Sequence, residues 1–140
     1  MKALILVMCA ATLALAAPVP KEAKRDDLDR IEGEWWEARF NEIVHAETAT
    51  ARRFRFNKDG TAGIYERVGA EPYRYEFAID QSTTPPSFTW NPKIGRGKYI
   101  ASYRIEGDML FIVFTDAAKP IAKEVKPGAG DVYYELKRVK

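Results

Sequence analysis

The sequence predicts an all-β domain, an antiparallel up-and-down barrel of about eight short strands. Runs rich in aromatic and β-branched residues alternate with polar residues at a period of two, which is typical of half-buried strands. Turn residues separate these runs at regular spacing. The chain has no long helical period and no strand-helix alternation, so a parallel α/β fold is excluded. A two-sheet sandwich is the alternative.

The first residues resemble an export signal. Lys2 precedes an apolar run from Ala3 to Ala16, and Ala14-Leu15-Ala16 offers the small residues that a signal peptidase reads. We therefore expect a signal peptide at residues 1–16, an extended linker at 17–26, and a periplasmic or extracellular protein. The less favoured alternative is an uncleaved anchor, because the run is short for a span of about 20 residues.

Composition narrows the chemistry of the mature chain. Cys9 is the only cysteine and lies in the apolar run, so no disulfide, thiol nucleophile or cysteine-metal site is expected after cleavage. Removing Lys2 from the 22 basic residues leaves 21 against 20 acidic ones, a net charge of +1. This balance predicts no nucleic-acid partner and no anionic membrane target. We expect no cofactor, no metal and no stable membrane insertion after cleavage.

The single domain predicted at residues 27–140 begins with a short helical turn through Ile31, capped by Asp26 or Asp27. A strand then runs from Gly33 to about Phe40, with Trp36, Ala38 and Phe40 on one face and Glu37 and Arg39 on the other. A loop carrying His45 is expected at residues 41–50.

The next strands are expected at residues 52–57 and 61–68, joined through Asp59-Gly60. A three-residue loop would pair Phe54 with Ile64 and keep the apolar side chains on one side, whereas a two-residue turn would not. Residues 72–80 follow with the cleanest alternation in the chain. Short strands are also expected at residues 87–91, 121–125 and 131–139.

The clearest hairpin spans residues 99–115. Its turn, Glu106-Gly107-Asp108-Met109, has glycine at the first central position, which suits a primed two-residue turn. This turn predicts three apolar cross-strand pairs on one face. They are Ile105 with Leu110, Tyr103 with Ile112, and Ala101 with Phe114.

Several motifs occur in a characteristic order. They are Leu28-x-x-Ile31-x-Gly33-x-Trp35, Phe54-x-Phe56, Asp59-Gly60, Tyr75-x-Phe77-x-Ile79-Asp80 with Pro85-Pro86, Tyr103-x-Ile105-x-Gly107-Asp108-x-Leu110, and Leu136-Lys137-Arg138. This order resembles a family of small secreted lipocalin-like domains of unknown function that is expanded in planctomycete bacteria. The resemblance covers roughly residues 27–140.

The resemblance implies a lipocalin-like barrel in which Trp35 closes one end and Arg138, near the end of the last strand, packs over it. The chain departs from full lipocalins in two respects, because it is shorter and lacks their long C-terminal helix. No ligand-binding residue can be transferred, since the resembled family has no established ligand.

Eight aromatic residues would point into such a barrel if the strand parities hold. The favoured interpretation is a filled core, because these side chains are large and the strands are short. The alternative interpretation is a small apolar pocket in which tyrosine hydroxyls bind the polar end of a ligand. The candidate ligand-binding residues are Phe54, Phe56, Tyr75, Phe77, Trp90, Tyr103, Phe114 and Tyr134.

No catalytic constellation is evident. His45, the only histidine, is expected in an exposed loop, although spacing alone leaves a Ser-His-Asp triad open. We therefore expect an exported, non-enzymatic domain that binds a small apolar ligand in its barrel. The alternative is a structural or protein-interaction module of the cell envelope with a fully packed barrel. A cavity above roughly 300 Å³ would favour the first hypothesis.

Overall fold

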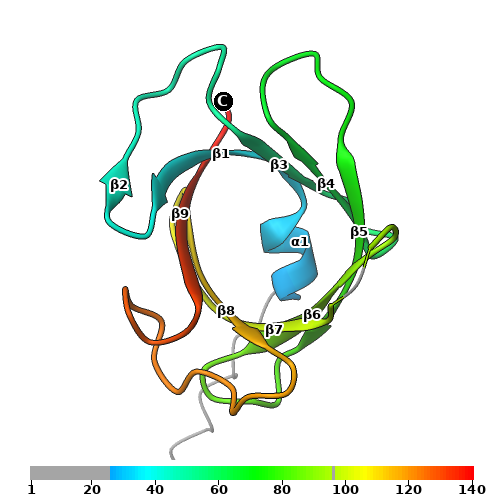
Figure 1. Cartoon of the computed structure of the whole chain (residues 1–140), viewed down its shortest axis with the longest axis vertical. Helices are drawn as coiled ribbons and strands as arrows, with labels where there is room; N and C mark the ends of the chain where they lie inside the picture. The colour runs from blue at the N-terminus through cyan, green and yellow to red at the C-terminus, as the bar shows by residue number, and fades with distance from the viewer. Residues whose placement is uncertain (1–25, 96) are drawn as a thin grey trace, which may run out of the picture.

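The computed structural model describes residues 26–95 and 97–140. The expected signal peptide and nearly all of the expected linker therefore lie outside the described residues. Within the described part, the strands form one antiparallel sheet in the order β2-β1-β3-β4-β5-β6-β7-β8-β9. Strand β9 also pairs with β1, which closes eight of the strands into a barrel (Figure 1). The predicted fold class is confirmed.

The structure has one short helix and nine strands among the described residues. None of these residues forms a helix long and apolar enough to cross a membrane. The elements are α1 (Asp27–Ile31), β1 (Gly33–Phe40), β2 (Ile43–Val44), β3 (Arg53–Phe56), β4 (Thr61–Tyr65), β5 (Tyr73–Asp80), β6 (Ser87–Pro92), β7 (Tyr99–Glu106), β8 (Met109–Asp116) and β9 (Val132–Arg138).

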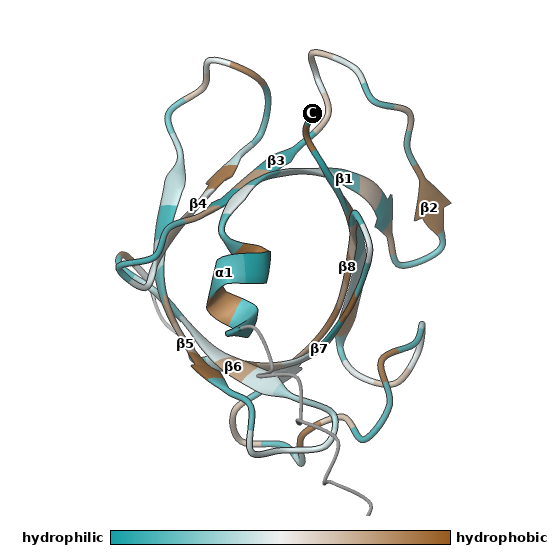
Figure 2. Cartoon of the chain, turned by 180° about the vertical axis from the view of Figure 1, so that it is seen from behind, coloured by the Kyte–Doolittle hydropathy of each residue, from teal (hydrophilic) through white to brown (hydrophobic). Residues whose placement is uncertain are grey.

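The two ends of the barrel differ. Helix α1 lies across one end, here termed the closed end, where the β3–β4, β5–β6 and β7–β8 turns also lie (Figures 1 and 2). The opposite end, termed the open end, carries β2 and the β4–β5 and β6–β7 loops. This assignment follows from the strand directions, because neighbouring strands run antiparallel.

The predicted registers are confirmed at both hairpins. Phe54 pairs with Ile64 across β3 and β4, as the three-residue loop requires. In the β7–β8 hairpin, Tyr103 pairs with Ile112, and the other two predicted apolar pairs also form. Gly107 has a φ of 56°, a conformation that glycine adopts without steric cost.

A core of mostly aromatic and aliphatic side chains fills the barrel. Neighbouring rings meet edge-on or tilted, the geometry that the aromatic quadrupole favours; Phe56 and Phe77, for example, have centroids 5.4 Å apart at 87°. The buried members are Ile31, Trp35, Phe54, Phe56, Ala62, Phe77, Phe88, Trp90, Ala101, Tyr103, Leu110, Ile112, Phe114 and Leu136. Burial of this set is the main stabilising contribution in the described fold.

The predicted strand at residues 121–125 is wrong, because this segment is a loop. Val125 is buried on the outside of the barrel in a second cluster with Val113 and Tyr133. The Ser102 hydroxyl donates a 2.7 Å hydrogen bond to the carbonyl of Ala122. A side chain of β7 thus satisfies the loop backbone where a neighbouring strand would otherwise be needed.

The prediction that Trp36, Ala38 and Phe40 share one face of the first strand is wrong. The register with β9 shifts between Glu37 and Arg39, which marks a β-bulge at Ala38. Beyond the bulge the ring of Phe40 packs against Tyr134, 5.2 Å between centroids. The expected loop at residues 41–50 likewise contains the two-residue strand β2.

Candidate functional site

A cavity of about 180 Å³ lies at the open end, on top of the packed core. Its walls are mostly rings and aliphatic side chains, with three tyrosines among them. The lining residues are Phe54, Ile64, Tyr75, Trp90, Tyr99, Phe114, Val132 and Tyr134. The interior is thus neither hollow nor completely filled.

The eight predicted ligand-binding residues divide into two groups. Five of them line the cavity: Phe54, Tyr75, Trp90, Phe114 and Tyr134. The other three lie in the core without lining it, and they are Phe56, Phe77 and Tyr103. Stacking of Tyr75 on Trp90, at 4.6 Å and 28°, forms part of the cavity wall.

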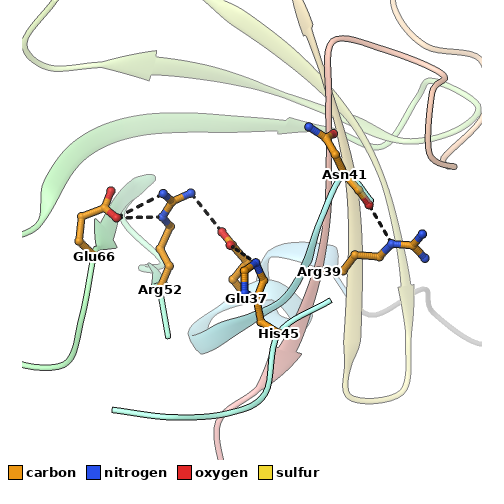
Figure 3. Close-up of polar contacts among 6 residues, drawn as sticks. All are labelled: Glu37, Arg39, Asn41, His45, Arg52 and Glu66. Carbon is orange, nitrogen blue, oxygen red and sulfur yellow. Dashed lines mark hydrogen bonds and ion pairs between the residues drawn. The ribbon is translucent and has the colours of Figure 1, made fainter. Parts of the chain in front are cut away.

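A cluster of charged residues lies next to these rings at the open end. Figure 3 shows its polar contacts. Glu37 shares the inward face of β1 with Trp35, and its side chain is only 7% exposed. Its carboxylate lies 3.2 Å from Nη1 of Arg52 and 3.2 Å from Nε2 of His45. Arg52 also donates through Nε and Nη2 to the more exposed Glu66.

The electrostatics of the cluster are dominated by desolvation. Burial raises the pKa of Glu37 above its usual value, and the opposing effects of Arg52 and His45 offset this only in part. Two carboxylates, Glu37 and Glu66, thus share the guanidinium of Arg52, and Glu37 also contacts His45.

Arg52 connects this charged cluster to the cavity. Its guanidinium lies 6.0 Å from the ring centroid of Phe40, which packs on the cavity-lining Tyr134. Burial raises the pKa of the Tyr134 hydroxyl to about 12, while the charge of Arg52 acts in the opposite direction. Burial raises the pKa of Tyr75 as well, again against the effect of Arg52. Charged and phenolic groups therefore meet at one side of the opening.

The rim of the open end carries large apolar side chains that face solvent. Their exposed fractions range from 37% for Tyr99 to 93% for Ile94. They lie in β2, in the β4–β5 and β6–β7 loops, and at the starts of β5 and β7. In the described part of the chain, all large apolar residues that are at least 37% exposed lie at the open end. They are Ile43, Val44, Val68, Tyr73, Ile94 and Tyr99.

The closed end is sealed by the predicted pair. The Arg138 guanidinium lies 4.2 Å from the ring centroid of the fully buried Trp35, which confirms the contact. It also donates to the carbonyls of Glu32, at 2.9 Å, and Arg30. A side chain at Gly33 would place its Cβ 3.0 Å from Nη1 of Arg138, so glycine leaves room for this contact.

The remaining sequence expectations concern catalysis and metals. His45 contacts Glu37, and no hydroxyl of the described serines and threonines is hydrogen-bonded to it. Among the described residues, no group of three His, Cys, Asp or Glu side chains could hold a metal ion.

Sequence reasoning missed Glu37, Arg52 and Glu66 as site residues. A signal for Glu37 was present, because it has the same strand parity as Trp35. Arg52 precedes β3, and its carbonyl accepts a 2.9 Å hydrogen bond from the amide of Glu37. That backbone contact, which no local pattern indicates, brings the two side chains together.

Comparison with known proteins gives no assignment. No protein-family model, no curated protein and no solved structure matches the chain.

Proposed function

We propose that the protein is an exported, non-enzymatic, lipocalin-like binding protein that takes a small apolar ligand at the open end of its barrel. The observation that carries this proposal is the cavity of about 180 Å³, walled by aromatic rings and open to a rim of exposed apolar side chains. Export rests on the apolar run at residues 3–16, and kinship with lipocalin-like domains rests on the motif order.

The volume limits the ligand to about one ring. An apolar cavity of about 150 Å³ is large enough for benzene. Enclosed drug-sized ligands need roughly 300 Å³ or more. The ligand is therefore a single-ring compound, or a longer molecule that inserts only its apolar end while the rim contacts the rest.

The charged cluster sets the polar end of the ligand. Arg52 is already engaged by Glu37 and Glu66, so it offers little to a carboxylate. A ligand carboxylate would also lie near the carboxylates of Glu37 and Glu66, and like charges in a partly desolvated site repel strongly. A neutral hydroxyl or an amine is favoured, with the Tyr134 hydroxyl as a hydrogen-bonding partner.

A second candidate function is a structural or interaction module of the cell envelope. The packed core below the cavity supports it, because the volume is below the 300 Å³ that would favour an enclosed ligand. The two candidates differ in one measurable property, which is saturable binding of small aromatic compounds.

Isothermal titration calorimetry with p-cresol, benzylamine and benzoate tests the proposal. We expect saturable binding of p-cresol and benzylamine at millimolar concentration or below, and at least about tenfold weaker binding of benzoate. Val132→Phe should abolish p-cresol binding, because the added ring fills the cavity.

Val68→Phe is the matched control, since it adds the same ring at an exposed position of the β4–β5 loop outside the cavity lining. It should bind p-cresol like the wild type. Absence of saturable p-cresol binding to the wild type would leave the interaction module as the better account.

A further inference from the structure

A large groove in the described part of the chain lies outside the barrel, at the closed end. It has a volume of about 670 Å³ and runs between α1, the end of β7, the β5–β6 loop and the β8–β9 loop. Its lining residues are Asp27, Arg30, Thr84, Pro85, Pro86, Tyr103, Arg104, Ile105, Lys123, Glu124, Val125 and Lys126. It shares no lining residue with the cavity of the open end.

The groove lies along a stretch of β7 that β6 leaves uncovered. Pairing between the two strands ends at Ser87 and Ser102, while β7 continues to Glu106 with β8 on its other side. The amide of Tyr103 donates a 3.0 Å hydrogen bond to the carbonyl of Pro86. Pro86 has no N–H to return to Tyr103, and Pro85 lacks one too, so the ladder cannot extend.

The uncovered stretch offers the backbone amide of Ile105 to a ligand. Hydrogen-bonding directions alternate along a strand, so Ile105 points its amide and carbonyl the same way as Tyr103, away from β8. The carbonyl of Ile105 accepts a 3.3 Å hydrogen bond from Nη2 of Arg30. Its amide faces the groove. A sheet edge of this kind is a template for an added extended segment.

Charge in the groove favours an acidic occupant. Its lining contains four cationic side chains, Arg30, Arg104, Lys123 and Lys126, against two carboxylates, Asp27 and Glu124. The two carboxylates pair with two of these cations: Asp27, which also accepts from the Tyr103 hydroxyl at 2.8 Å, pairs with Arg30, and Glu124 pairs with Lys126. Arg104 pairs with Glu106, so Lys123 is the cation of the lining that forms no ion pair with a described residue.

The floor of the groove is apolar. Pro85, Pro86, Ile105 and Val125 line it beside the cations. One apolar side chain of an extended segment could pack there while its neighbours, which point the opposite way, meet the lysines.

The chain's own lead-in is a poor occupant. Residues 17–25 contain Lys21, Lys24 and Arg25 against Glu22, a net charge of 3 − 1 = +2. The groove lining has the same sign, with four cations against two carboxylates. The two would repel each other.

We infer that this groove binds an extended acidic segment of a partner protein, which adds to the edge of β7 at Ile105 and directs its carboxylates toward Lys123 and Lys126. The inference is independent of ligand binding at the open end. It makes the protein a two-site molecule, with a small-molecule site and a peptide site at opposite ends of one barrel.

Two-dimensional amide NMR of the purified full chain tests this inference with two capped octapeptides, one alternating Glu and Val and one alternating Lys and Val. We expect the acidic peptide to shift the amide of Ile105 and those of residues 123–126 saturably, with an affinity that falls as salt is raised. The Lys peptide should cause no saturable shift.

The double variant Lys123→Glu/Lys126→Glu should weaken binding of the acidic peptide roughly tenfold or more, because two attractions become repulsions. Lys98→Glu makes the same kind of change at the open end and should leave the affinity unchanged. Equal binding of the two peptides, shifts that avoid Ile105, or no saturable binding of the acidic peptide would each overturn the inference.

Discussion

The two ends of this barrel accommodate their buried polar groups in different ways. At the closed end, Trp35 is fully buried, its indole N–H donates to the carbonyl of Ile31 at 2.8 Å, and Arg138 covers its face. At the open end, the buried polar group is the carboxylate of Glu37, which lies beside a cavity and an apolar rim. At the closed end Trp35 and Arg138 donate to backbone carbonyls, whereas the open end holds a buried carboxylate beside a cavity.

Inside the barrel, the contrast indicates which end contributes stability and which end has room for a ligand. Rings and aliphatic side chains that fill the barrel at the closed end contribute burial free energy, and the groove at that end lies on the outside of the barrel. The open end tolerates a carboxylate whose pKa is raised by burial, and such groups gather at functional sites more often than elsewhere. The following predictions test whether the two ends differ in this way.

The largest expected effect is at Trp35. Replacing it with alanine should cost about 3–5 kcal/mol of unfolding free energy. The reason is that removal of the fully buried indole leaves a cavity that the surrounding strands cannot close. Denaturant unfolding followed by circular dichroism measures this. Val68→Ala at the open rim should change stability by less than about 0.5 kcal/mol. A Trp35→Ala loss below about 1 kcal/mol would mean that the closed end is not the stabilising end.

A smaller effect is expected at Arg138. Arg138→Lys should lose about 0.5–2 kcal/mol, since an ammonium neither stacks on the indole nor reaches two carbonyls in the same fork. Arg104→Lys is the matched control, because that guanidinium lies 4.5 Å from the ring centroid of Phe111 on the outside of the barrel. It should lose no more than about 0.5 kcal/mol. Equal losses of unfolding free energy in the two variants would mean that Arg138 at the closed end contributes no more to stability than Arg104 on the outside of the barrel.

At Glu37 we expect a change in how stability depends on pH rather than a large loss of stability. Its pKa is higher in the folded than in the unfolded protein, so the folded state binds the proton more tightly and stability falls as pH rises from about 4.5 through the raised pKa. Glu37→Gln removes this contribution. The stability of the variant relative to the wild type should therefore increase with pH in that window, as measured by denaturant unfolding at several pH values. A difference that is constant with pH, or that decreases, would contradict the raised pKa.

The sequence predicted the regular parts of the barrel well. At the β7–β8 hairpin, the turn chemistry of Gly107 and the apolar face containing Ile112 require the same strand register. The sequence therefore allowed only one register for this hairpin. The prediction failed at residues 121–125, where the spacing of Ile121 and Val125 resembles a strand. There the contact that decides the structure, from Ser102 to Ala122, is tertiary and leaves no local pattern.

The candidate site could be predicted only in its apolar part. Inward parity identified Phe54, Trp90 and Phe114 correctly, because strand alternation alone determines which way they point. Glu37 was missed because a charged residue in an alternating strand is usually on the solvent side. The bulge at Ala38, which changes the faces beyond it, has no signature in the residues themselves.

Methyl NMR during a titration with p-cresol tests most directly whether the open end is the binding end. The methyl groups of Ile64 and Val132 line the cavity, and those of Ile31 and Ile105 lie at the closed end. We expect saturable shifts of the Ile64 and Val132 methyl signals with one affinity, and no shift of the Ile31 and Ile105 signals. Saturable shifts centred on Ile31 and Ile105, or no saturable shift of Ile64 and Val132, would contradict this prediction.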